Sequence, residues 1–149
     1  MKPLASAISA LAVLSVAAAG CSSKSPGGAQ DKLYSLEASA RTPEVVAGEK
    51  GEVELQLKLA RGVHVSDEAP FKILLSGRGL APDKERLGHA DAAPMQGASS
   101  GEGATRFEIP FTAQSKGPAS LGADLDFYVC TATLCERQQE KVQVKVTVK

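Results

Sequence analysis

Hydrophobic and polar residues alternate along two long segments of the chain. In the first, Val53, Leu55, Leu57 and Leu59 alternate with polar or charged residues, and near the C-terminus valines do the same. The valines of that second segment are Val142, Val144, Val146 and Val148. Because side chains in a strand point alternately to opposite faces, a period of two predicts strands with one buried face.

Further strand-like runs lie at residues 33–40, 71–75, 107–113 and 119–129, separated by Gly, Pro and Asp. No segment has the apolar spacing of an amphipathic helix. So many short strands in a chain of this length predict an all-β fold, an antiparallel β-sandwich of immunoglobulin-like type. The Gly- and Ser-rich residues 92–103 are expected to form a long mobile loop.

The N-terminus has the pattern of a bacterial lipoprotein signal peptide. Lys2 is followed by an apolar, Ala-rich stretch that ends in Ala18-Ala19-Gly20-Cys21. Small residues directly before a cysteine predict cleavage and lipidation at Cys21. The alternative is ordinary secretion with Cys21 free. Either way the chain is exported to the cell envelope, and lipidation would anchor it to a membrane with its domain facing the periplasm.

These features divide the chain into three parts. Residues 1–20 are the predicted signal peptide, residues 21–31 the lipidated cysteine and a flexible tether, and residues 32–149 a single sandwich domain. The chain has 17 basic and 17 acidic residues. This balance gives no indication of a nucleic-acid partner.

With Cys21 set aside, two cysteines are left, Cys130 and Cys135. They lie at the end of one strand-like run and just before another, so they can form a disulfide only if the chain turns back between them. Closing so small a loop stabilises a fold by about 2 kcal/mol, a modest effect. Two interpretations stay open: a redox-active pair at a hairpin tip, or a hairpin staple without redox chemistry.

Three segments of the chain resemble the N-terminal periplasmic domain of the thiol-disulfide interchange protein DsbD. They are Gly-Val-His-Val-Ser-Asp-Glu-Ala-Pro-Phe-Lys-Ile-Leu-Leu at 62–75, Arg-Phe-Glu-Ile-Pro-Phe at 106–111, and Phe-Tyr-Val-Cys-Thr-Ala-Thr-Leu-Cys at 127–135. The closing valine strand fits as well. The resemblance covers most of the chain after the tether, and its most specific element is the cysteine hairpin.

This resemblance implies an immunoglobulin-like component of a thiol-disulfide oxidoreductase system. Its partners would be thioredoxin-fold proteins of the envelope and a separate membrane electron donor. Cys135 would form the mixed disulfide with a partner and Cys130 would resolve it. The family covers its disulfide with an aromatic residue in a cap loop, where this chain offers only Met95.

Residues near the pair add smaller expectations. Arg137 would favour a thiolate at Cys135, and Glu136 would oppose it. Tyr128 would flank the pair or, more simply, pack within its strand. The adjacent Asp67 and Glu68 suit an exposed charged loop better than an acid-base pair, because neighbours in a strand point to opposite faces.

A soft metal site is a different hypothesis. His64 with Cys130 and Cys135, joined by His89 or Met95, has ligands that zinc or copper(I) accepts. The isolated histidines lack the close spacing usual for such sites, so we predict neither a metal nor another cofactor. The predicted function is thus disulfide exchange with protein partners; the alternative is a non-redox envelope lipoprotein that binds or scaffolds another protein.

Overall fold

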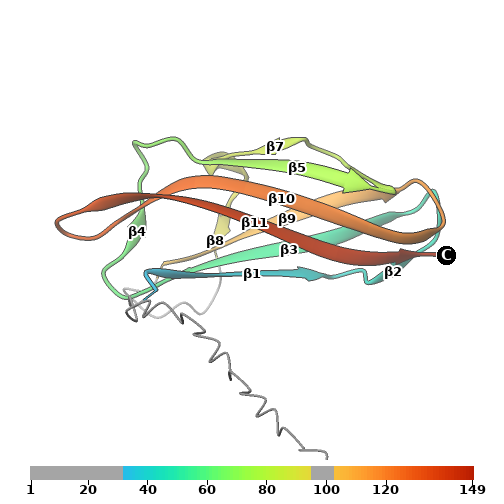
Figure 1. Cartoon of the computed structure of the whole chain (residues 1–149), viewed down its shortest axis with the longest axis horizontal. Coiled ribbons are helices and arrows are strands. Elements are labelled where there is room, and N and C mark those ends of the chain that lie inside the picture. Colours follow the sequence, from blue (N-terminus) through green and yellow to red (C-terminus); the bar gives the residue numbers. More distant parts are fainter. Residues whose placement is uncertain (1–31, 95–102) are drawn as a thin grey trace, which may run out of the picture. The chain divides into compact units, whose positions relative to one another are not determined.

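Two β-sheets packed face to face make up the domain (Figure 1). The computed structural model describes residues 32–94 and 103–149. The first sheet has the order β1-β3-β9-β6, with β8 paired to β9: β1 Tyr34–Ala40, β3 Lys50–Leu59, β6 Leu80–Pro82, β8 Ala93–Pro94 and β9 Ala104–Ala113. The second has the order β2-β11-β10-β5-β7, with β4 paired to β10: β2 Glu44–Val45, β4 His64–Val65, β5 Lys72–Arg78, β7 Arg86–Leu87, β10 Gly117–Cys130 and β11 Cys135–Val148.

The order of the strands is that of an immunoglobulin-like domain. β1, β3, β9 and β6 take the places of strands A, B, E and D in one sheet, and β5, β10 and β11 take those of C, F and G in the other. All pairings are antiparallel except the short one between β2 and β11. The predicted all-β sandwich is therefore confirmed.

Alternate residues of both sheets form the core. Val53, Leu55 and Leu57 of β3 face inward and are almost fully buried, as their alternation with polar residues predicts. Three phenylalanines fill the space between the sheets. The largest fully buried side chains are Phe107, Phe111, Phe127, Leu55, Leu57, Ile73, Ile109, Leu121, Val53 and Val129. Burial of these apolar groups is the main term that stabilises the fold.

A glycine-rich turn carries the chain from one sheet to the other. Gly79 has φ 71°, a left-handed conformation that glycine adopts without steric cost. A Cβ on Gly77 would lie 1.8 Å from the carbonyl oxygen of Leu80, so the backbone can approach this closely only without a side chain. The turn ends β5 in the second sheet and begins β6 in the first.

The structure extends several predicted strands and shortens the predicted loop. β11 begins at Cys135 rather than near Val142, and Ala93–Pro94 pair with β9 as β8 although residues 92–103 were expected to form a loop. The remainder of that segment, 95–102, lies outside the described residues, as do the predicted signal peptide (1–20) and tether (21–31) with Cys21. In the part that the structure describes, no helix has the length and apolar character needed to cross a membrane.

Candidate functional site

The two cysteines close the end of a long hairpin. β10 and β11 pair along their whole lengths, from Gly117 opposite Val148 to Cys130 opposite Cys135. The hairpin extends past β1 and β3 at one end of the sandwich, where β4 is the one described strand that pairs with it (Figure 1). The cysteines thus lie at the most projecting end of the second sheet.

Thr131 holds the turn between the cysteines. Its N–H donates to the carbonyl of Leu134 at 2.8 Å, and its Oγ1 accepts from the N–H of Leu134 at 3.2 Å. Hydrogen-bonded and non-hydrogen-bonded pairs alternate along antiparallel strands, so Cys130 and Cys135 form the next, non-hydrogen-bonded pair. In such a pair the side chains lie close together on one face of the sheet, as a disulfide requires.

The cysteines are joined by a disulfide. Their sulfurs are 2.01 Å apart and their Cα atoms 4.0 Å. The chain does turn back between the two residues, which was the condition that the sequence set for this bond. The disulfide predicted from the sequence is therefore present.

The two halves of the disulfide differ in their access to solvent. Only 3% of the Cys130 surface is exposed, whereas Cys135 is an exposed residue. Leu134, directly before Cys135, exposes 56% of its surface and is one of few large hydrophobic residues that do so among the described residues. Cys135 is therefore the more accessible of the two cysteines.

β4 explains why Cys130 is covered. His64 pairs with Cys130 and Val65 with Val129, and the N–H of Ser66 donates to the carbonyl of Tyr128 at 3.0 Å. Cys130 therefore has a strand on each side, and His64 lies beside it on the same face of the sheet. Among the strands that the structure describes, Cys135 has a neighbour, β10, on one side only.

Strand pairing brings together three of the candidate metal ligands: His64, Cys130 and Cys135. Both sulfurs are bonded to each other, which leaves no thiolate to act as a ligand. Among the described residues, no group of three His, Cys, Asp or Glu side chains is placed to hold a metal ion. His89 instead packs its ring against Phe71 with centroids 4.9 Å apart, and Met95 lies outside the described residues.

Arg137 faces Asp126 rather than standing as a free charge. Its Nε donates to Asp126 Oδ1 at 2.8 Å and its Nη2 to Oδ2 at 2.5 Å. The hydrogen bonds from Arg137 lower the pKa of Asp126, and Asp126 in turn raises the pKa of Arg137. The side chain of Arg137 is thus engaged by a carboxylate, and its effect on a thiolate at Cys135 stays a prediction.

The remaining candidates near the hairpin are placed as follows. Glu136 is exposed and, as the next residue along β11, points to the opposite face from Cys135. Tyr128 is half-buried on the same face as Cys130, two residues before it. Asp67 and Glu68 lie in the exposed loop between β4 and β5, as expected for a charged loop.

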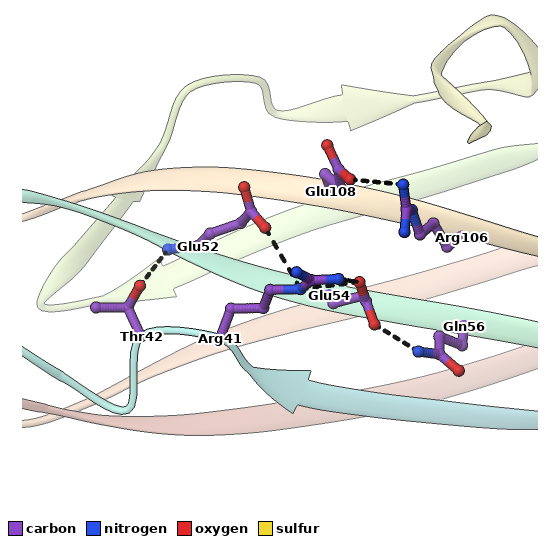
Figure 2. A network of polar contacts seen from close by, with 7 residues as sticks. All are labelled: Arg41, Thr42, Glu52, Glu54, Gln56, Arg106 and Glu108. Atoms are coloured by element: carbon purple, nitrogen blue, oxygen red, sulfur yellow. Dashed lines mark hydrogen bonds and ion pairs between the residues drawn. The ribbon is translucent and has the colours of Figure 1, made fainter. Parts of the chain in front are cut away.

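A second group of charged side chains covers the outer face of the first sheet (Figure 2). Glu54 on β3 is 5% exposed and accepts hydrogen bonds from Gln56 and from Arg41, whose Nε lies 2.9 Å from Glu54 Oε2. These hydrogen bonds lower the pKa of Glu54, and the one from Gln56 has the largest effect. Arg106 pairs with Glu108 at 3.2 Å on the neighbouring strand. Its three glutamates, Glu52, Glu54 and Glu108, are each ion-paired with one of two arginines, Arg41 or Arg106.

A cavity of about 480 Å³ lies between β9 and the segment from β6 to β8. Four carboxylates line it: Glu52, Asp83, Asp91 and Glu108. Each is in an ion pair, with Arg41, Lys50, Lys84 and Arg106 respectively. The hydrogen bond from Lys84 lowers the pKa of Asp91. The cavity therefore offers no carboxylate without a partner, and the hairpin tip is the better candidate site.

Comparisons with known proteins add little to this geometry. No family model matches the chain, and no curated protein does. Among solved structures, the chain is similar to AggA, the major subunit of aggregative adherence fimbriae type I from Escherichia coli, with 13% identity, coverage of 78% of this chain and 95% of that one, and a TM-score of 0.38. It is also similar to the ASH/PapD-like domain 7 of human CEP192, with 15% identity, coverage of 76% and 84%, and a TM-score of 0.38. Neither similarity is close enough to carry an argument about function.

Proposed function

We propose that this protein exchanges disulfides with protein partners through the Cys130–Cys135 pair. The observation that carries the proposal is the asymmetry of the hairpin tip: Cys135 is exposed and Cys130 is 3% exposed. Exchange needs one sulfur that a partner can reach and a second that stays close enough to resolve the mixed disulfide. A bond serving only as a staple needs no such difference.

The chemistry follows from the positions of the two sulfurs. A partner thiolate attacks Cys135 Sγ, a new bond forms between the partner and Cys135, and Cys130 leaves as a thiolate. A second thiolate of the partner then attacks the partner's own sulfur in the mixed disulfide and releases Cys135. The partner is oxidised to a disulfide by two electrons, and the hairpin is reduced to a dithiol. Run in reverse, the same steps let the reduced hairpin reduce a partner.

The sequence resemblance to the N-terminal domain of DsbD supports the same roles for the two cysteines. By this resemblance the partners are thioredoxin-fold proteins of the bacterial envelope, and a separate membrane protein supplies electrons. The signal pattern ending at Cys21 supports a lipid anchor that would keep the domain at the membrane. An exported protein also meets the oxidising conditions in which such a disulfide persists.

The proposal is tested by trapping partners in the envelope of the producing bacterium. Cys130→Ser removes the resolving sulfur, so a mixed disulfide with a thioredoxin-fold protein should accumulate on Cys135. The matched variant Cys135→Ser keeps only the covered sulfur and should trap at least about tenfold less, because access controls exchange. Non-reducing electrophoresis with mass spectrometry identifies the adducts. Equal trapping by both variants, or none by either, would contradict the proposal.

A further inference from the structure

Cys130, whose sulfur leaves in the proposed exchange, has surroundings that disfavour a thiolate. Only 3% of its surface is exposed, and β4 and β11 lie on its two sides. A thiolate in such a place loses most of its hydration, and this loss disfavours the charged form. A positive charge close to Cys130 would offset the cost and help the disulfide to open.

His64 is the basic residue that the fold places beside this sulfur. It pairs with Cys130 in the register of β4 and β10, so the two side chains lie on the same face of the second sheet. Residues directly opposed in neighbouring strands have Cβ atoms about 5 Å apart, which brings an imidazole within reach of a thiolate. In the described part of the chain, His64 is the one basic residue that pairs directly with either cysteine.

His64 can also carry the required charge. The residue is exposed, so its imidazole can gain a proton without burying a charge. Histidine gains and loses this proton near neutral pH. The positive charge beside Cys130 would therefore be present in mildly acidic solution and absent in alkaline solution.

Other titratable groups surround the pair. They are Arg61 before β4, Asp67 and Glu68 in the loop after it, Lys72 on β5, Asp126 and Tyr128 on β10, and Cys135, Glu136 and Arg137 on β11. Arg137 is engaged by Asp126, and Glu136 points to the opposite face of the sheet. Carboxyl, phenol, ammonium and guanidinium groups ordinarily titrate outside the range from about pH 5.5 to about pH 8.5. A change in the behaviour of the disulfide within that range therefore points to a histidine.

We propose that protonated His64 stabilises the thiolate that Cys130 becomes when a partner's thiolate attacks Cys135. This inference rests on the proposed function and adds a residue that assists its covalent step. In that step a bond forms between the partner's sulfur and Cys135 Sγ, and the electron pair of the broken S–S bond stays on Cys130 Sγ. His64 keeps its proton, so an imidazolium and the new thiolate lie side by side on β4 and β10.

The test measures how fast dithiothreitol reduces the disulfide of the purified protein near about pH 5.5 and about pH 8.5. His64→Gln removes the positive charge, whereas His64→Lys keeps one at both pH values. His89→Gln is the matched control, because His64 and His89 are the only histidines in the chain and His89 packs against Phe71. Free thiols are alkylated and counted by mass, and thermal unfolding checks that all variants are folded. Comparing proteins at the same pH cancels the pH dependence of dithiothreitol itself.

Near pH 5.5, the unchanged protein should be reduced about tenfold faster than His64→Gln, the effect of one opposite charge close to a thiolate. Near pH 8.5 histidine is neutral, so the two rates should be about equal. His64→Lys should be faster than His64→Gln at both pH values, and His89→Gln should behave as the unchanged protein does.

Two results would overturn the role of His64 while leaving exchange intact. One is a ratio of rates between the unchanged protein and His64→Gln that is the same at both pH values, as a purely structural role would give. The other is a His64→Lys variant that is no faster than His64→Gln. A disulfide that dithiothreitol reduces in none of these proteins would instead refute the proposed function itself.

Discussion

The two cysteines, which face each other across the hairpin tip, have very different surroundings. Cys130 lies between two strands, whereas Cys135 has a neighbour on one side only. The cation nearest in sequence, Arg137, is matched by Asp126. Access to each sulfur therefore distinguishes the two cysteines.

At the residue scale, Glu54 gives a prediction about pH. Its folded-state pKa is lowered from 4.5 by hydrogen bonds from Gln56 and Arg41. A lowered carboxyl pKa contributes stability that is complete above the unfolded-state value and is lost as the pH falls through the folded-state value. Glu54→Gln should thus cost about 1–2 kcal/mol near pH 7 and clearly less near pH 3.

Urea unfolding at the two pH values measures this difference. Glu37→Gln, which changes an exposed carboxylate on the neighbouring strand, is the control and should cost less than about 1 kcal/mol at either pH. A cost for Glu54→Gln that is the same at both pH values would show that the hydrogen bonds do not favour the ionised form.

At the scale of elements, the hairpin of β10 and β11 is built differently at its two ends. The last residues of β11, from Val144, alternate between buried and exposed because they cover the core. The first residues, from Cys135, are mostly exposed on both faces because this end extends beyond the sandwich. On the β11 side, this end is therefore held mainly by strand pairing and the disulfide, whereas on β10 Phe127 and Val129 remain fully buried.

This difference also explains what sequence could predict. Alternation predicted β3 and the end of β11, where one face is buried. The first half of β11 is polar on both faces and gives no such signal. The strands β2, β4, β6, β7 and β8 have two or three residues each, too few to show a period.

Only part of the candidate site could be predicted, because some of its features depend on residues close in sequence and others on pairing between distant strands. The disulfide could be expected, because its cysteines are close in sequence and flank a turn. The position of His64 beside Cys130 could be suggested only by residue type, since β4 pairs with a residue far along the chain. The pairing of Arg137 with Asp126 depends on the register of the hairpin, which the sequence does not state.

Removing the disulfide tests how far the hairpin depends on it. The double variant Cys130→Ser with Cys135→Ser should lower the free energy of unfolding by no more than about 2 kcal/mol, because the bond closes a short loop. The sandwich should stay folded, since most of its buried core residues lie between the sheets and away from the tip. Circular dichroism and denaturant unfolding measure both, and a variant that fails to fold would support the staple.

At the scale of the whole molecule, the proposed exchange site lies on a domain that the signal pattern predicts to be anchored to a membrane. Cleavage before Cys21 would leave a short Ser- and Gly-containing tether before β1. A tether of this composition would let the domain reorient while the predicted anchor kept it close to the membrane. The hairpin tip is then available to partners in the same compartment.

The anchor itself is a prediction. The mature protein should begin at a Cys21 that carries lipid, and Cys21→Ser should leave the chain unprocessed or free of the membrane. Mass spectrometry of the mature N-terminus and fractionation of the envelope check both outcomes. A mature chain with an unmodified Cys21 would point to ordinary secretion.

The central claim is that the Cys130–Cys135 bond takes part in exchange, and its reduction potential tests this most directly. The purified protein is equilibrated in glutathione or dithiothreitol buffers of known potential, and its free thiols are alkylated and counted by mass. If the bond is redox-active, its reduction potential should lie near about −200 mV, within the range of thioredoxin-fold exchange partners. A value below about −300 mV would place the bond among inert structural disulfides and would show that it does not take part in exchange.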